Sequence, residues 1–189
     1  MHRREEYAYI LDIIPPEQVI MKEPNLVKKG FPRNEAYVQA IGEEYFILLE
    51  LTVKPGVEIN VLEKVYIGSG VRDKIDKIVR RIKYDELTEE AKQNLDKILP
   101  ELVKRKEKKF VEFFNKAGPI TLKLHSLELL KGIGKKTLWQ ILEERKKKPF
   151  ESFEDIKSRV GIDPEKLILD RIIRELKGEE KYIIFVGSL

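Results

Sequence analysis

The sequence predicts an α+β fold in which a small β-barrel is followed by an all-helical domain. Two observations carry this prediction. Apolar and polar residues alternate, as in β-strands, along much of the chain as far as Tyr84, and apolar residues recur at helical spacing from Thr88 onward. The chain also has 189 residues, 42% of them hydrophobic, which suffices for two modest cores.

The barrel is predicted from five runs rich in β-forming residues that are joined by turns. These runs are Tyr7–Ile14, Ala36–Ile41, Tyr45–Val53, Val61–Ile67 and Asp76–Tyr84. Pro15 and Pro16 close the first run, because proline cannot donate a hydrogen bond to a neighbouring strand. The segment Gly42–Glu44 has the length of a short hairpin loop, so the second and third strands are expected to pair.

The helical region begins at Thr88, whose hydroxyl is suited to cap a helix. Pro100 is expected to break or restart this helix, because an internal proline removes a hydrogen bond. A second helix follows and ends at Gly118 and Pro119, in the usual order of glycine cap and then proline. The aromatic residues on its apolar stripe are predicted to lie in the core: Phe110, Phe113 and Phe114.

A glycine-rich turn, Leu130–Lys136, lies between two further helical patterns and is here called the first hairpin. Gly132 and Gly134 allow backbone conformations that other residues avoid, and they carry no side chain that would hold a ligand away. Ile133 between them is suited to fix the turn to the core. The flanking apolar residues predict a helix on each side: Leu124, Leu127 and Leu130 before the turn, and Leu138, Ile141 and Leu142 after it.

This turn has the features of a phosphate-binding site. A helix that begins near Lys135 presents unpaired N–H groups and the positive end of its dipole to the turn. Lys131, Lys135 and Lys136 add positive charge, and Thr137 offers another donor. Such contacts fix a nucleic-acid backbone without reading its sequence. The alternative is that the turn only joins two helices.

A second turn, Arg159–Glu165, here called the second hairpin, repeats the pattern with a difference. Asp163 stands where the second glycine is expected, and its carboxylate would repel phosphate. Asp163 is instead predicted to cap the next helix, with Pro164 as its first residue. The stretch Pro119–Leu176 resembles the tandem helix-hairpin-helix domain, with only the first hairpin competent to bind.

The whole chain resembles an uncharacterised archaeal family, DUF655-like, that is described as predicted nucleic-acid-binding. The segments that carry the resemblance are Arg80–Tyr84, Lys109–Asn115, His125–Leu130 and Pro149–Ile156. The resemblance implies an OB-like barrel joined to a tandem helix-hairpin-helix domain, and it favours RNA and a link to translation or transcription. The expected domains are an OB-like barrel at 1–86, a helical connector at 87–118, a tandem helix-hairpin-helix domain at 119–178, and a C-terminal strand at 179–189 that returns to the barrel.

The barrel is a candidate for a second binding surface, because OB barrels combine a basic groove with aromatic platforms. Its basic candidates are Lys77, Arg81 and Lys83, which strict alternation places on one face, with Ile78 and Arg80 on the other. Tyr37, Tyr45 and Tyr66 are the aromatic candidates, although each is expected to be partly buried in so small a barrel.

Several enzyme classes are disfavoured. The absence of cysteine excludes disulfides and thiolate chemistry, and two histidines leave little for a metal site, so no metal or cofactor is expected. A DNA glycosylase would need a catalytic aspartate in a Gly-Pro-Asp-like loop, whereas Asp163 lies inside the second hairpin. The carboxylates do not cluster as in a metal nuclease, and His125 is expected to pack or cap rather than act as a base.

The sequence therefore predicts a non-catalytic protein whose partner is nucleic acid, either RNA or DNA. Ribosome- or transcription-associated proteins are further candidate partners, and the alternative function is a protein-interaction scaffold in an information-processing complex. No apolar segment has the roughly 20 residues of a membrane helix. A cytoplasmic location is expected, and the oligomeric state stays open.

Overall fold

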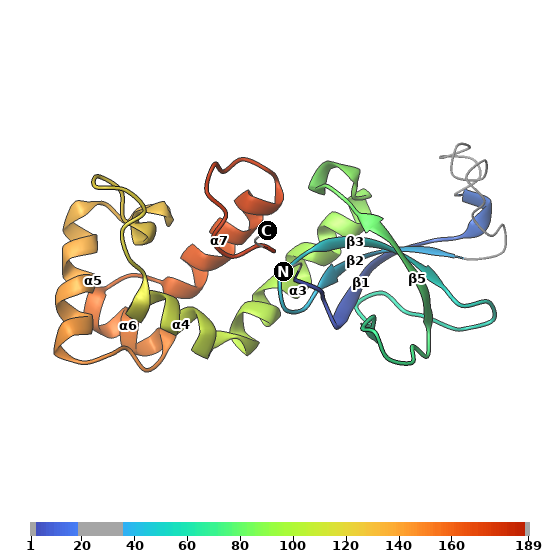
Figure 1. The fold of residues 1–189 in the computed structure, drawn as a ribbon, viewed down its shortest axis with the longest axis horizontal. Coiled ribbons are helices and arrows are strands. Elements are labelled where there is room, and N and C mark those ends of the chain that lie inside the picture. Colours follow the sequence, from blue (N-terminus) through green and yellow to red (C-terminus); the bar gives the residue numbers. More distant parts are fainter. Residues whose placement is uncertain (1–2, 19–35, 188–189) are drawn as a thin grey trace. The chain divides into compact units, whose positions relative to one another are not determined.

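The computed structural model describes residues 3–18 and 36–187, which form a sheet and a series of helices (Figure 1). The predicted α+β class is confirmed. The chain divides into two compact units, of which unit 1 comprises residues 1–98 and 176–189 and unit 2 comprises residues 99–175. Residues 1–2 and 19–35 of the predicted barrel domain and residues 188–189 of the predicted C-terminal strand lie outside the described residues.

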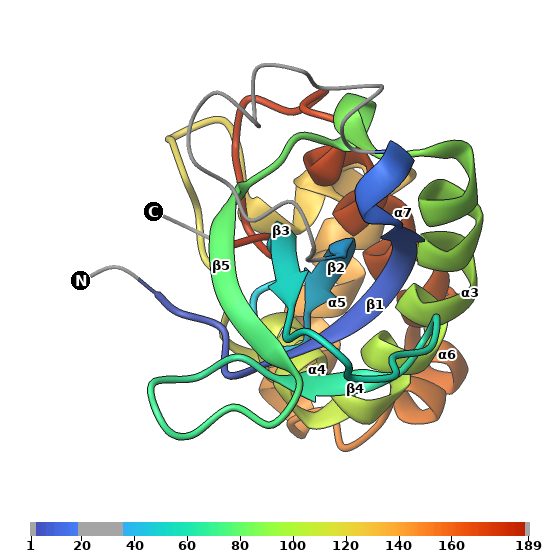
Figure 2. The same cartoon turned by 90° about the vertical axis from the view of Figure 1, so that its right-hand side faces the viewer.

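Unit 1 contains a five-stranded sheet in the order β4-β1-β2-β3-β5, with every neighbouring pair antiparallel. The strands are β1 (Tyr7–Ile14), β2 (Tyr37–Gly42), β3 (Leu48–Val53), β4 (Lys64–Tyr66) and β5 (Ile75–Arg81). The sheet is curled into a half-barrel, with β4 and β5 at its two edges (Figure 2). All five predicted strands are present, although several begin or end at other residues than expected.

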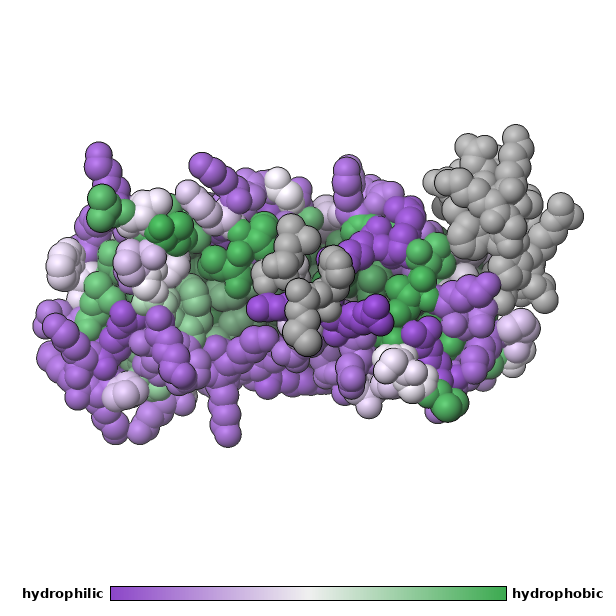
Figure 3. All heavy atoms as spheres, viewed as in Figure 1, coloured by the Kyte–Doolittle hydropathy of each residue, from purple (hydrophilic) through white to green (hydrophobic). Residues whose placement is uncertain are grey.

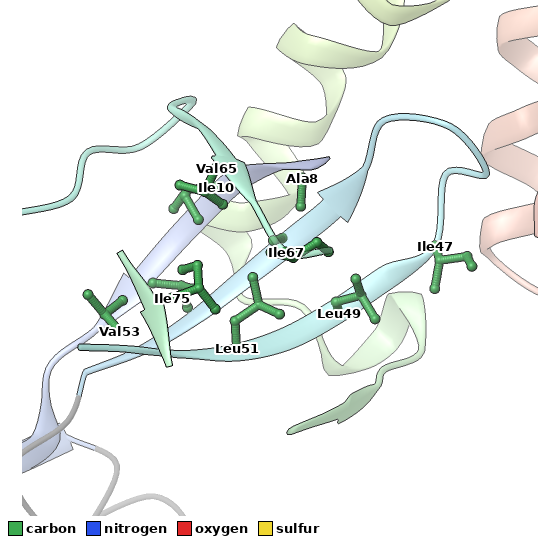
Figure 4. Close-up of a cluster of buried hydrophobic side chains, with 11 residues drawn as sticks. Ala8, Ile10, Ile47, Leu49, Leu51, Val53, Val65, Ile67 and Ile75 are labelled. Atoms are coloured by element: carbon green, nitrogen blue, oxygen red, sulfur yellow. The ribbon is translucent and has the colours of Figure 1, made fainter. Parts of the chain in front are cut away.

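The inner face of the half-barrel holds an apolar core cluster of unit 1 (Figure 4). Alternate residues of the strands point into it, as the period of two requires. Its buried members are Ala8, Ile10, Val38, Ala40, Ile47, Leu49, Leu51, Val53, Val65, Ile67 and Ile75. Every residue of β2 and of β3 is buried, so both faces of the sheet are covered at its centre.

The start of β3 is displaced from Tyr45 to Leu48 by the buried carboxylate of Glu5. This carboxylate accepts hydrogen bonds from the backbone N–H groups of Glu44 and Tyr45, at 2.8 and 2.7 Å. It occupies the space where a Cβ atom at position 42 would lie, so Gly42 is required there. The loop before β3 therefore wraps around Glu5 and does not continue the ladder.

A β-bulge at Leu11 joins the outer face of the sheet to the first helix, α3 (Glu89–Arg105). The Leu11 carbonyl accepts a hydrogen bond from the Asn94 side chain at 2.8 Å. The predicted cap of α3 is confirmed, because the Thr88 hydroxyl accepts from the Ala91 N–H at 3.0 Å. The Gln39 side chain also accepts from the Thr88 N–H at 3.0 Å, which ties the helix start to β2.

Two irregularities in the pairing of β3 with β5 overturn the predicted faces of β5. Directly opposed residues share a face, and Ile75, Ile78 and Arg81 oppose Val53, Leu51 and Leu49 of the core face. The two extra residues change the spacing of inner-face residues from two to three. Arg81 therefore lies on the inner face with Ile78, and not with Lys77, which opposes Thr52.

Pro100 does not break its helix, contrary to expectation. It lies inside α3, and the chain bends out of helical geometry only at Lys106, with φ −104° and ψ 22°. The helices that follow are α4 (Glu107–Lys116), the 3₁₀ helix η2 (Ser126–Leu129), α5 (Lys135–Lys147), α6 (Phe153–Val160) and α7 (Pro164–Leu176). None of the helices in the described residues is long and apolar enough to cross a lipid bilayer.

The predicted C-terminal strand at Tyr182–Val186 is wrong, because this segment has no strand pairing. The segment does return to the half-barrel, where the Gly187 N–H donates to the Tyr45 carbonyl at 2.6 Å. Tyr45 belongs to the loop before β3, and β3 already pairs with β2 and β5. The tail therefore contacts the loop before β3 and adds no strand there, because β3 itself has no free edge.

Candidate nucleic-acid interface

The first hairpin follows a short capped turn of helix rather than the longer helix that Leu124, Leu127 and Leu130 predicted. η2 has only four residues. The Nδ1 atom of His125 accepts a hydrogen bond from the Leu127 N–H at 3.1 Å, and Glu128 accepts from the His125 N–H at 3.0 Å. This reciprocal cap confirms His125 as a capping residue.

The turn itself adopts the geometry that its glycines permit. Gly132 has φ +90°, a conformation that L-residues with side chains rarely adopt. Gly134 is extended, and a Cβ atom placed there would meet nothing within 4 Å, so its absence leaves open space in front of α5. Ile133 is buried, and its N–H donates to the Leu130 carbonyl at 3.1 Å, which fixes the turn to the core as predicted.

The N-terminus of α5 opens onto this space without a side-chain cap. Gly134 is the N-cap, and no side chain among the described residues bonds to the first turn. The first helical hydrogen bond joins the Leu138 N–H to the Gly134 carbonyl at 2.9 Å. The amides of Lys135, Lys136 and Thr137 therefore remain available to an external acceptor.

The three predicted lysines differ in their partners. Lys135 forms an ion pair with Glu128 at 2.8 Å and donates to the Lys123 carbonyl at 3.0 Å. The hydrogen bond from Lys135 to Glu128 lowers the pKa of the Glu128 carboxyl, with a further contribution from the His125 N–H. Lys131 and Lys136 are exposed and have no carboxylate partner in the described part of the chain. The free positive charge at the turn thus comes from two lysines, not three.

A buried ion pair on α7 supports the entry to the first hairpin. Arg171 is only 1% exposed and bonds to Glu175 at 2.9 Å. A second guanidinium nitrogen donates to the Leu129 carbonyl at 3.1 Å, directly before the hairpin. The other end of α5 is fixed as well, because Arg145 donates to the Ala117 carbonyl at 2.7 Å.

The second hairpin is closed by its own side chain, as predicted. Gly161 has φ +78° and ends α6 in the left-handed conformation. Asp163 accepts a hydrogen bond from the Lys166 N–H at 3.2 Å, and Pro164 is the first residue of α7. A carboxylate therefore occupies the position at α7 that is empty at α5.

The predicted barrel residues do not form one surface. Lys77 and Lys83 are exposed, whereas Arg81 lies on the inner face and its guanidinium donates to the Arg3 carbonyl at 3.4 Å. Tyr37 is buried, and Tyr45 and Tyr66 are half-buried, as expected for a small barrel. Tyr66 packs edge-on against Tyr7, with ring centroids 5.4 Å apart.

Sequence reasoning missed two exposed apolar residues near the first hairpin. Trp139 lies one turn beyond Lys135 on α5 and is 63% exposed, and the side chain of Leu122 is fully exposed. Apolar groups reach the surface in this part of unit 2 (Figure 3). The signal was present in the sequence, because Trp139 falls outside the apolar stripe of Leu138 and Ile141.

The described residues contain no group of three or more histidine, aspartate or glutamate side chains placed to hold a metal ion. What the site offers is therefore hydrogen-bond donors, positive charge and exposed apolar surface around one turn.

Comparison with known proteins shows where the chain belongs. The family described as "Protein of unknown function (DUF655)" matches residues 4–187. The chain belongs to the DUF655 family. An uncharacterised protein of Methanocaldococcus jannaschii is 45% identical over 186 residues, which cover 96% of this chain and 80% of that protein.

A solved member of the DUF655 family has the same fold. The crystal structure of Af1531 from Archaeoglobus fulgidus superposes with a TM-score of 0.78 at 47% identity, covering 96% of this chain and 99% of that one. The predicted relationship to an uncharacterised archaeal family is thus confirmed.

Proposed function

We propose that this DUF655 protein is a non-catalytic nucleic-acid-binding protein whose first hairpin holds the phosphate backbone. The observation that carries the proposal is the uncapped N-terminus of α5, which lies behind Gly132 and Gly134 and beside the unpaired Lys131 and Lys136. The same turn thus offers backbone amides, the positive end of the helix dipole and two free cations.

The chemistry of this position matches a phosphate oxygen. Up to three N–H groups, those of Lys135 to Thr137, are oriented along the helix axis, and the open space at Gly134 lets a phosphate approach them. None of these donors distinguishes one base from another. Binding is therefore largely independent of sequence, and RNA and DNA are both admitted as partners.

The architecture supports this proposal in two ways. The two glycine turns, each followed by a helix, fit a tandem helix-hairpin-helix domain, although the helix before the first hairpin is only η2. The curled five-stranded antiparallel sheet with open edges fits an OB-like barrel. Both folds are frequent in nucleic-acid-binding proteins, which makes a link to translation or transcription the expected context.

A charge-reversal experiment tests the proposal. Lys131→Glu combined with Lys136→Glu should weaken the binding of labelled single-stranded RNA and DNA. It should also reduce the slope of log affinity against log salt concentration by about 1 to 2. Lys135 is left intact, because its ion pair with Glu128 supports the turn. The control, Lys146→Glu with Lys157→Glu, makes the same charge change at exposed sites elsewhere in unit 2.

Equal affinities of the two variants in fluorescence anisotropy would contradict the proposal. The alternative is a protein-interaction scaffold, and the exposed Trp139 and Leu122 are the observation that favours it. Protein partners that co-purify equally well after nuclease treatment would support the scaffold.

A further inference from the structure

The half-barrel of unit 1 contains a pocket at the opening between its two edges. The pocket has a volume of about 470 Å³, within the range of small-molecule sites. The segment before β1 and the segment after β4 border it on one side, where the Ile67 N–H donates to the Glu6 carbonyl at 2.8 Å. β5 borders it on the other side, with Ile78 and Arg81 facing inward.

The floor of the pocket is apolar. Ile47, Leu49 and Ile67 belong to the core of the half-barrel (Figure 4). The same three residues also line the pocket. Ile78 is 40% exposed, although it lies on the inner face of the sheet. Ile47, Leu49 and Ile67 are themselves almost fully buried, so Ile78 supplies the accessible apolar surface of the pocket.

The rim is rich in arginine. Five arginines and two glutamates line the pocket, and Arg80 is the only one of these arginines among the described residues that is paired with carboxylates, those of Glu50 and Glu86. Glu5 is occupied by backbone N–H groups. The remaining cations lie around an opening that carries an excess of positive charge.

Three of the four arginines without a described carboxylate partner are held in place by uncharged groups. Arg81 reaches the Arg3 carbonyl at 3.4 Å, and Arg72 donates to the Gly68 carbonyl at 2.9 Å. The Arg3 guanidinium lies 5.4 Å from the centre of the Tyr45 ring. Backbone and ring contacts of this kind orient a guanidinium without neutralising its charge.

We infer that this pocket binds one nucleotide unit, with its base against the apolar floor at Ile78 and its phosphate on the arginines. Guanidinium groups bind phosphate through paired hydrogen bonds and also stack on bases. The same chemistry is offered by a nucleotide within a single strand and by a free mononucleotide. This inference rests on the proposed nucleic-acid function and extends it to a site in the other unit.

The test is titration of the full chain with nucleoside 5′-monophosphates and with a single-stranded oligonucleotide, observed through the amide NMR signals of Ser69, Ile78 and Arg81. Arg4→Glu with Arg81→Glu should weaken mononucleotide binding by about tenfold or more. Lys97→Glu with Lys177→Glu makes the same charge change at exposed sites of unit 1 that do not line the pocket, and it should leave mononucleotide binding unchanged.

Two further arms identify the ligand and separate the two sites. Ile78→Gln should weaken mononucleotide binding but not the binding of inorganic phosphate, and inorganic phosphate that binds as tightly as a mononucleotide would overturn the inference. Suppose that Lys131→Glu with Lys136→Glu abolishes oligonucleotide binding and the arginine variant leaves it unchanged. This result would overturn the inferred nucleotide site in the pocket and would leave the proposed role of the first hairpin intact. The reverse result would overturn the proposed role of the first hairpin and retain the pocket.

Discussion

The two hairpins of unit 2 share a backbone plan and differ in the residue at the helix N-cap. Each contains a glycine of positive φ, +90° at Gly132 and +78° at Gly161, and each leads into a helix of 13 residues. At the N-cap, however, α5 has Gly134 and α7 has Asp163. The N-terminus of α5 is open to an external anion, whereas at α7 the Asp163 carboxylate already accepts a hydrogen bond from the Lys166 N–H.

This difference shows that the turn geometry and the open helix N-terminus, on which the proposed anion site rests, are separable properties. Glycines at the turn follow from backbone conformation alone, and they recur in both hairpins. The anion site depends on whether the first-turn amides are already bonded, and a single carboxylate decides that. A glycine-rich hairpin pattern is therefore insufficient evidence of phosphate binding.

The largest expected effect comes from the support that α7 gives to the first hairpin. Arg171→Ala removes the bond to the Leu129 carbonyl and leaves Glu175 buried without this partner. We expect a loss of about 3–5 kcal/mol in the free energy of unfolding, measured by urea denaturation. Arg174→Ala, on the same helix with a more exposed ion pair, should cost about 1 kcal/mol or less. Equal losses in the two variants would show that Arg171 does not support the hairpin.

Substitution of the glycines of the two turns tests directly whether the hairpins are alike in stability and different in binding. Gly132→Ala and Gly161→Ala each place a Cβ atom at positive φ, so each should destabilise the protein by about 1–2 kcal/mol in the same denaturation assay. Only the substitution at Gly132 should also weaken nucleic-acid binding. A loss of binding in both variants would indicate a general effect of destabilisation.

Local features of this chain were predictable from sequence, and those that depend on distant partners were not. Thr88 and Asp163 were identified as caps because a cap is set by residues within one helical turn. The inner-face position of Arg81 was missed, because two bulges against β3 change the spacing of β5. Likewise, Arg171 contacts a carbonyl 42 residues away, and no local pattern reports that contact.

The cap of η2 makes the first hairpin sensitive to pH, whereas the second hairpin has no histidine. Burial, with a contribution from Arg145, lowers the pKa of His125 below its usual 6.5. The unfolded state therefore binds the proton more tightly, and stability is present in full above about pH 6.5 and is lost as the pH falls through the folded pKa. Protonated Nδ1 also cannot accept a hydrogen bond from the Leu127 N–H, so we expect the free energy of unfolding to fall by about 1 kcal/mol.

The measurement is the difference in unfolding free energy between pH 7 and pH 5. His125→Asn keeps a capping side chain that does not titrate in this range. Between pH 7 and pH 5, the unfolding free energy of this variant should therefore fall by about 1 kcal/mol less than that of the natural protein. Identical pH profiles would show that His125 protonation is not coupled to folding.

The smallest change in stability is expected from exchanging the two N-cap residues. This exchange tests whether the N-cap residue decides which hairpin binds an anion. Gly134→Asp should stabilise α5 by a few tenths of a kcal/mol and abolish the proposed phosphate contact, because the new carboxylate would bond to the free amides and repel the anion. Asp163→Gly should cost a few tenths of a kcal/mol and open the N-terminus of α7. If the cap alone decides competence, anisotropy titrations should show binding lost in the first variant and gained in the second, with both folds unchanged. Binding that is lost in the first variant but not gained in the second would mean that the open helix end is not sufficient. The second hairpin also lacks the two lysines, having Val160 and Glu165 in place of Lys131 and Lys136, and it lacks one amide donor, because Pro164 stands in place of Lys135.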